Sequence, residues 1–263
     1  MPRTANKRTK TTDIISQNVR GLKSKVKTKE LCKQINNHRI FAACIQETWL
    51  NGHSIVDHDN CTFIHHGLDA NVDKSKRGKG GVAIVLSKEA TRAWNASGRT
   101  VFNNFGSRIV AVRLICQDSR GKNVSIYLIS AYAPIGVAKD NVWREFLDNL
   151  EQCIRNKAKE DILLIGCDCN SSLGISYERK PEEEKPSVGK FGLPHRNEAG
   201  VRFLTFLETL NLVAITTYFR KRNYATWTHP LYILIILYFP PSSYIRKVRL
   251  LPFYRCISKT TVS

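Results

Sequence analysis

The pattern of apolar and polar positions along this chain predicts a mixed α/β domain. Short runs that are apolar nearly throughout, bounded by turn residues, are typical of buried β-strands. Segments whose apolar residues recur every three or four positions are typical of helices packed on a sheet. Strands are expected at Asp13–Gln17, Phe41–Gln46, Cys61–His65, Gly81–Leu86, Arg108–Ile115, Val124–Ala131 and Asp161–Gly166. Helices are expected at Val26–Asn36, Val142–Ile154 and Arg202–Leu210.

Polar residues stand directly at the ends of several predicted strands. Asn18 follows the first, Glu47 the second, and Tyr132, Asp168 and Asn170 follow two later ones. Taken singly, such a residue is usually solvated. In open α/β folds, however, ligands bind where strands end, because side chains there project from a rigid frame into a crevice. The joint placement of these residues therefore predicts one functional site.

The residue types at these strand ends suit the cleavage of a phosphodiester. That reaction needs a cation against the phosphate charge, a positioned water and a group that manages protons. Glu47 offers a carboxylate and Asn18 an amide oxygen, which are hard ligands for Mg²⁺, with Mn²⁺ as the alternative. Asp168 could orient or deprotonate water, and Asn170 would point to the same side if its strand continues. Tyr132 offers a hydroxyl to a phosphate oxygen.

Charge favours a polyanionic partner, and the predicted chemistry makes DNA the expected one. The formal net charge of the chain is +19, and no acidic residue follows Glu208. The first 33 residues carry ten Lys or Arg against two acidic residues. The segment Pro2–Lys10 is either a solvated tail or a set of phosphate contacts. With a nucleic-acid substrate, this charge indicates an intracellular, nuclear location.

Cysteine spacing and hydropathy indicate the cellular compartment and bear on membrane association. The eight Cys show no CxxC pairs or zinc-finger spacing, and no secretory signal peptide precedes them, which indicates a reduced, intracellular protein. Cys167 and Cys169 beside Asp168 are expected to serve packing. The apolar run Leu231–Phe239 has nine residues, about half of what a bilayer-spanning helix needs, so no membrane span is predicted. The run is β-prone and could fill a strand position. No obligate protein partner is evident.

Seven short motifs occur in a fixed order along the chain. They are Gln-Asn-Val-Arg-Gly-Leu from Gln17, Gln-Glu-Thr-Trp from Gln46, Gly-Gly-Val-Ala-Ile from Gly80, Ala-Tyr-Ala-Pro from Ala131, Asp-Cys-Asn-Ser from Asp168, Arg-Asn-Glu-Ala-Gly from Arg196 and Thr-Trp-Thr-His-Pro from Thr226. This ordered set resembles the endonuclease/exonuclease/phosphatase superfamily. Within it, the pattern is most similar to the apurinic/apyrimidinic-type endonuclease domain that precedes the reverse transcriptase in non-LTR retrotransposons, and host proteins of the craniofacial development protein 2 group share it. The resemblance covers roughly Asp13 to Pro230 and implies a four-layer α/β sandwich of the DNase I-like type.

The resemblance also implies roles for the strand-end residues. Glu47 would be the chief metal ligand, with Asn18 beside it at the metal. Tyr132 would contact the scissile phosphate, Asp168 would activate the attacking water, and Asn170 would help to hold the phosphate. The implied reaction is Mg²⁺-dependent nicking of DNA.

Four further residues are expected to lie near the bound nucleic acid. Arg20 and Lys23 are basic residues within or next to the first motif. Trp227 and Thr228 stand where the family places residues near DNA, although a core position is an equal alternative for the tryptophan.

The last family motifs have no counterpart in this chain. The family continues with an Ile-Asp strand and ends with Ser-Asp-His, whose histidine acts on the phosphate. Here no acidic residue follows Glu208, and the last histidine, His229, lies within an earlier motif. His65, His66 and His195 are expected at the surface or in loops.

The expected organisation follows from that departure. Residues 1–11 form a basic tail, 12–230 the nuclease-type domain, incomplete at its C-terminus, and 231–263 an aberrant apolar and basic tail. A frameshift, a spliced end or a decayed element copy would produce such an end, and weak or absent activity is expected. The alternatives are a nucleic-acid-binding relic without catalysis, and a phosphatase or phospholipase of the same superfamily.

Overall fold

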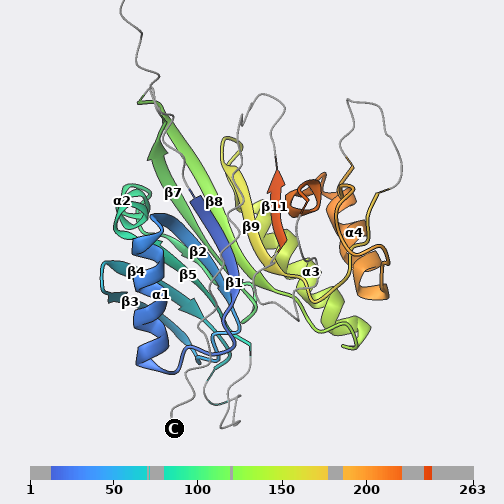
Figure 1. Ribbon diagram of the computed structural model, residues 1–263, viewed down its shortest axis with the longest axis horizontal. Coiled ribbons are helices and arrows are strands. Elements are labelled where there is room, and N and C mark those ends of the chain that lie inside the picture. Colours follow the sequence, from blue (N-terminus) through green and yellow to red (C-terminus); the bar gives the residue numbers. More distant parts are fainter. Residues whose placement is uncertain are drawn as a thin grey trace, which may run out of the picture.

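Two β-sheets pack face to face, with helices on the outer side of each, as the computed structural model shows (Figure 1). The structure describes residues 13–69, 71, 80–118, 121–176 and 186–220, and the backbone of 234–238. The arrangement confirms the predicted four-layer α/β sandwich.

The first sheet is built from the N-terminal part of the chain. It contains β1 (Asp13–Asn18), β2 (Ile40–Gln46), β3 (His53–His58), β4 (Cys61–His66) and β5 (Val82–Ser87), in the order β1-β2-β5-β4-β3. Strands β1 and β2 run parallel, and the other neighbours are antiparallel. Every residue of β2 is buried because both faces of this central strand are covered, which explains its unbroken apolar run.

The second sheet follows in sequence and has six strands in the described part of the chain. They are β6 (Val101–Phe102), β7 (Ile109–Gln117), β8 (Asn123–Tyr132), β9 (Ile162–Asp168), β10 (Val213–Ala214) and β11 (Leu234–Tyr238), in the order β10-β11-β9-β8-β7-β6. Strands β8 and β9 are parallel, and β11 lies antiparallel between β9 and β10. Part of the β-prone run near the C-terminus therefore fills a strand position, as expected.

Helices complete the layers. Helix α1 (Lys25–Asn37) covers the outer face of the first sheet, while α3 (Asp140–Arg155) and α4 (Glu198–Thr209) cover the second. Helix α2 (Lys88–Ala96) packs against β5 and β7, and a short 3₁₀ helix spans Ile215–Tyr218. No helix in the described ranges is long and apolar enough to cross a bilayer.

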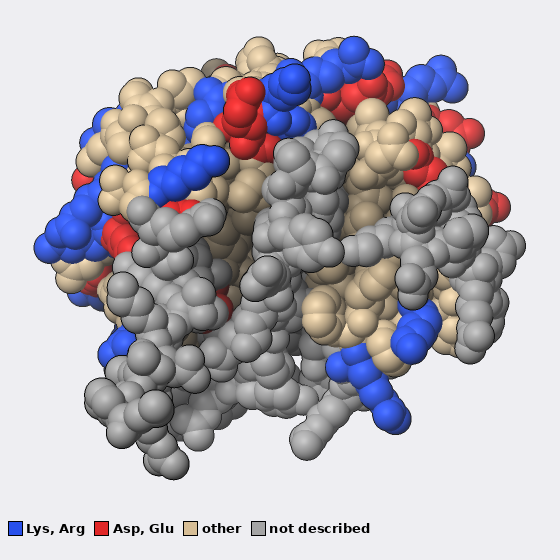
Figure 2. Space-filling view, turned by 90° about the horizontal axis from the view of Figure 1, so that it is seen from above, with Lys and Arg blue, Asp and Glu red and all other residues tan. Residues whose placement is uncertain are grey.

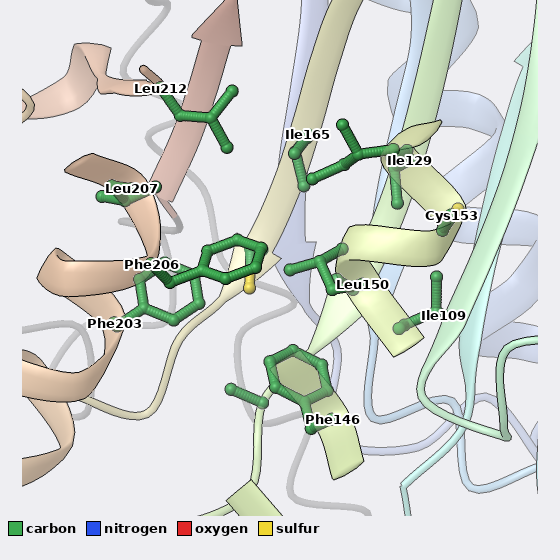
Figure 3. Packing of buried hydrophobic residues seen from close by; sticks show 14 of the residues in the cluster. Ile109, Ile129, Phe146, Leu150, Cys153, Ile165, Phe203, Phe206, Leu207 and Leu212 are labelled. Carbon is green, nitrogen blue, oxygen red and sulfur yellow. The ribbon is translucent and has the colours of Figure 1, made fainter. Parts of the chain in front are cut away.

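Three apolar clusters lie between these layers. One lies between α1 and the first sheet, one between the two sheets, and one between the second sheet and the helices α3 and α4. The last cluster brings together Phe146 and Leu150 of α3, Phe203 and Phe206 of α4, and Ile165 of β9 (Figure 3). Burial of these large side chains on both faces of the sheets is the main stabilising term of the fold.

All seven predicted strands and all three predicted helices are present, with shifted ends. Helix α4 begins at Glu198, earlier than expected, because the Asn197 side chain caps it by accepting a hydrogen bond from the Gly200 N–H. The capping residue belongs to the Arg-Asn-Glu-Ala-Gly motif, which therefore has a structural function. Val26, the first apolar residue of the predicted N-terminal helix, is 76% exposed and does not contribute to the packed face of α1.

The pattern missed β3 and α2, together with the two-residue strands β6 and β10 and the short 3₁₀ helix, and it misplaced the side chain of His65. Strand β3 has five exposed residues among its six, so it carries no burial signal, and α2 buries mainly small alanines beside Trp94. His65 was expected at the surface or in a loop and is buried at 2% exposure. It lies in β4 between β3 and β5, which pair with it on both sides.

Candidate active site

The predicted strand-end residues meet at one edge of the sandwich. Asn18 is the last residue of β1 and Glu47 follows β2, while Tyr132 and Asp168 end β8 and β9. The parallel registers place Asn18 opposite Gln46 in the first sheet and Tyr132 opposite Asp168 in the second. Because both parallel pairs end at the same edge, residues up to 150 positions apart come together.

One amide joins the carboxylates of the two sheets. Nδ2 of Asn18 donates to Oε1 of Glu47 at 2.7 Å and to Oδ2 of Asp168 at 2.8 Å. Its Oδ1 accepts from the backbone N–H of Arg20 at 3.1 Å. In this orientation the amide nitrogen, and not the oxygen, faces the carboxylates.

Tyr132 closes the same cluster. Its hydroxyl donates to Oε1 of Glu47 at 3.0 Å, the oxygen that also accepts from Asn18. Burial raises the pKa of Tyr132 to about 12, and the nearby Glu47 carboxylate acts in the same direction. Tyr132 is therefore a hydrogen-bond donor throughout the neutral range.

Arg108 holds the strand end that carries Tyr132, a contact that the sequence analysis did not predict. Its guanidinium lies over the Tyr132 ring, 5.3 Å from the centroid, and its Nη1 donates to the carbonyls of Tyr132 at 3.2 Å and Ala133 at 3.4 Å. Burial lowers the pKa of Arg108. No sequence signal distinguishes this arginine from others that precede buried strands.

Asn170 stands beside Asp168 in a turn. The Asn170 N–H donates to Oδ1 of Asp168 at 3.2 Å, and Nδ2 of Asn170 donates to the carbonyl of Ala133 at 2.8 Å. Its φ of 43° and the φ of 54° at Glu47 both lie in the left-handed region. Asn adopts this region readily, whereas Glu does so at some cost, and such strain is commonly found at functional sites.

The environment of Asp168 favours a nearby cation. Burial raises the pKa of Asp168, and hydrogen bonds donated by Asn18 and Asn170 oppose that effect. The charge of Arg20 also lowers this pKa, whereas the charge of Glu47 raises it. A positive charge between the two carboxylates would relieve their mutual repulsion.

The described residues contain no cluster of three or more His, Cys, Asp or Glu that could hold a metal by themselves. At this site, two carboxylates, Glu47 and Asp168, and the amide of Asn18 converge. Such a donor set is too small to enclose a cation, but it fits the open site that Mg²⁺ uses when water and phosphate oxygens complete its shell. The seven described cysteines are free, and Cys167 beside Asp168 is buried.

The residues expected near nucleic acid are placed in part. Arg20 and Lys23 are both exposed and lie in the loop between β1 and α1, which begins beside Asn18. That loop packs closely on the second motif, since a Cβ at Gly21, whose φ is 103°, would lie 2.5 Å from the Trp49 ring. Trp227 and Thr228 lie outside the described residues.

The described surface carries charges of both signs. On the face shown in Figure 2, Lys and Arg lie interspersed with Asp and Glu and do not gather into one patch. The basic excess of the whole chain is therefore not reflected in a single basic patch on the described part of this face.

Comparison with solved structures establishes the class of fold. The AP endonuclease LMAP from Leishmania major has a TM-score of 0.54 at 13% identity, over 86% of this chain and 78% of that chain. The APE2 catalytic domain from Xenopus laevis also scores 0.54, at 14% identity over 85% and 81% of the two chains. An AP endonuclease from Archaeoglobus fulgidus scores 0.51 at 14% identity, over 86% of each chain. The chain thus shares its fold with these AP endonucleases.

Sequence comparison gives a more specific likeness. The chain is 30% identical over 155 residues to craniofacial development protein 2 from Bos taurus, and equally to that from Tragulus javanicus. The matched segment is 58% of this chain but only 23% of the Bos taurus protein. No family model matches the chain. The resemblance predicted from the ordered motifs is confirmed.

Proposed function

We propose that this chain is a divalent-cation-dependent DNA endonuclease domain of the non-LTR retrotransposon type, which nicks one strand by phosphodiester hydrolysis. One observation carries the proposal. The Asn18 amide bridges Glu47 and Asp168 across two sheets while Tyr132 donates to the same Glu47 oxygen. The fold, which three AP endonucleases share, is compatible with this activity, and the choice of a nuclease rests on the site and on the charge of the chain.

The cation would lie at the two carboxylates. Glu47 is proposed as the chief ligand, with Asn18 beside it, and Mg²⁺ or Mn²⁺ suits these hard oxygen donors. When bound, the cation neutralises charge that develops on the phosphate oxygens. The Asn18 amide would have to rotate to offer its oxygen, because its nitrogen faces the carboxylates in the present orientation.

The remaining roles belong to groups of this chain. Asp168 is proposed to orient the attacking water and accept its proton, with its carboxylate held by Asn18 and by the Asn170 N–H. Tyr132, which keeps its proton, is proposed to donate to a phosphate oxygen. Asn170 is proposed to help hold the phosphate from its turn beside Asp168.

The substrate would be held mainly through its phosphates. Arg20 and Lys23, exposed beside the site, are proposed to contact DNA, as are Trp227 and Thr228. The net charge of +19 supports a polyanionic partner and, with a DNA substrate, a nuclear location.

We further propose that the activity is weak. Residues 209–263 contain no acidic side chain, so they offer no carboxylate to orient a catalytic histidine, and His229 is the only histidine among them. Losing a positioned acid-base group costs about 10²–10⁴-fold in rate. The proposed division into a basic tail at 1–11, a nuclease domain at 12–230 and an aberrant tail at 231–263 rests on the same composition.

A plasmid-nicking assay tests the proposal. Supercoiled DNA is incubated with Mg²⁺ and the chain, or its Glu47→Ala or Asp168→Ala variant, each shown to be folded by circular dichroism. We expect slow nicking that either substitution abolishes. Glu151→Ala removes a partly buried carboxylate of α3, which pairs with Arg155 away from the site, and is the matched control, which should nick like the parent. Equal nicking by all four proteins would contradict the proposed site.

A DNA-binding relic without catalysis is the second candidate. The same acid-free segment and the large positive charge favour it. Binding that weakens steeply as salt rises, combined with no nicking by the folded parent in Mg²⁺ or Mn²⁺, would identify it. Hydrolysis of inositol phosphates or phospholipids, but not of DNA, would identify the phosphatase or phospholipase alternative.

A further inference from the structure

A buried amide lies directly beneath the candidate active site. Gln46 ends β2, immediately before Glu47, and its side chain is 0% exposed. Its Nε2 lies 3.2 Å from Ser16 Oγ, 3.2 Å from Ser130 Oγ and 3.1 Å from the carbonyl oxygen of Gly166. The Ser130 hydroxyl donates in turn to the carbonyl of Ile45 at 3.1 Å, so it accepts from Gln46. One side chain thus links β2 to β1, β8 and β9.

The partners of this amide stand in a regular relation to the site. Ser16 precedes Asn18 by two residues, Ser130 precedes Tyr132 by two, and Gly166 precedes Asp168 by two. Residues two apart in a strand point to the same face. The amide therefore contacts each strand that carries a site residue, one layer below that residue.

The sheets can approach one another here because Gly166 has no side chain. A Cβ at this position would lie 2.4 Å from the Cβ of Cys44 and 2.7 Å from Ser16 Oγ. The thiol of Cys44 donates across the same interface to the carbonyl of Ile129 at 3.4 Å. The layer around Gln46 is therefore a close contact in which polar groups of both sheets pair directly.

We propose that Gln46 is a positioning residue for the nuclease site, and this inference rests on the proposed function. Glu47 belongs to the first sheet and Asp168 to the second, so their relation depends on how the sheets are placed. Apolar contacts between sheets are non-directional. Buried hydrogen bonds are directional, and breaking them leaves unpaired groups in a site without water. Gln46 thereby fixes the relative position of the sheets at the end where the carboxylates meet.

Replacement of the amide by an apolar group of similar length tests this role. Gln46→Met keeps the volume and removes the donors. We expect kcat for plasmid nicking to fall about 100-fold with KM changed by less than about threefold, because the reacting groups are misplaced while the DNA contacts remain. Ser130→Ala removes one of the three acceptors and should lower kcat by about fivefold.

A control separates positioning from stability. Ile64→Val shortens a core side chain of β4, a strand that does not pair with β2, and it should lower the melting temperature without lowering kcat. If Gln46→Met does not fold, the double variant Ser16→Ala, Ser130→Ala removes two acceptors while leaving Gln46 in place and is measured instead.

Crystal structures of the parent and of Gln46→Met give a readout that does not depend on activity. The parent should keep the Asn18 bonds to Glu47 and Asp168, whereas in the variant at least one should lengthen beyond about 3.5 Å. A folded variant that retains both bonds and the parent kcat would overturn the positioning role. A parent that does not nick would refute the proposed function alone, because the two structures still decide whether Gln46 sets the geometry.

Discussion

Gln46 and His65 are both buried polar side chains of the first sheet, yet their surroundings differ. The Gln46 amide is within hydrogen-bond distance of three acceptors, whereas neither ring nitrogen of His65 makes a hydrogen bond of normal geometry with the described residues, although the backbone of Leu50 acts to raise its pKa. The hydrogen bonds of the buried Gln46 amide fix the position of one sheet relative to the other. The surroundings of His65 leave a base whose charged form is penalised by desolvation. A buried polar side chain thus positions its neighbours only where hydrogen-bond partners surround it.

The environment of His65 makes the contrast dependent on pH. Burial lowers the pKa of His65 to about 4, and the nearby His66 and His53 act in the same direction. The pKa of His66 is also lowered, mainly by burial. The ring of His65 borders Gly81, where an added Cβ would lie 3.4 Å from its Nε2.

The largest effect on the free energy of unfolding is expected at Gly166, where the two sheets approach one another most closely in the layer around Gln46. Gly166→Ala would place a Cβ 2.4 Å from that of Cys44, so the sheets must move apart and the Gln46 bonds must stretch. We expect a loss of about 3 kcal/mol or more in the free energy of unfolding, measured by urea denaturation. Gly136→Ala is the matched control, because its nearest neighbours lie at 3.8 to 4.0 Å and no strain is expected. Equal effects of the two substitutions would show that the sheet contact is not tight at Gly166.

The sequence is sufficient to predict the strands and the candidate site residues, but not the hydrogen-bonded layer around Gln46. Strands such as β2 are recognisable because both faces are covered, and the site residues because they stand at strand ends. The partners of Gln46 are 30, 84 and 120 residues away, so they can be found only when the packing of two sheets is known. His65 ends a predicted strand, where a histidine is expected to be exposed, and its burial depends on Gly67 and Gly81, which lie beside its ring in the folded chain.

An intermediate effect is expected for His65 in acid. Its folded-state pKa of about 4 lies below the value near 6.5 of an unfolded histidine, so only the unfolded chain gains a proton between these values. Stability is therefore fully present above pH 6.5 and falls as the pH drops toward 4. His65→Leu should remove about 2–3 kcal/mol of the loss between pH 7.5 and 4.5.

Urea denaturation of the parent and His65→Leu at these two pH values measures the difference. At pH 7.5 the variant should be at least as stable as the parent, because a buried neutral imidazole without hydrogen bonds has a desolvation cost that leucine avoids. His58→Leu, a substitution at a half-buried histidine of β3, is the control and should leave the acid sensitivity unchanged. An identical pH dependence of all three would show that His65 is protonated in the folded protein.

The smallest effect sharpens the comparison most directly. Ser130→Ala should cost about 1 kcal/mol of folding stability, because the Ile45 carbonyl and one donor of Gln46 lose a partner. In the Gln46→Met background the cost should be smaller by about 0.5 kcal/mol or more, since the two side chains share a hydrogen bond.

His65 has no partner in common with Gln46, and β5 lies between their strands. His65→Leu and Gln46→Met should therefore be additive within about 0.5 kcal/mol at pH 7.5. If His65→Leu and Gln46→Met were coupled while Ser130→Ala and Gln46→Met were additive, the contrast would be contradicted. That result would mean that the histidine, and not the serine, interacts with the Gln46 amide.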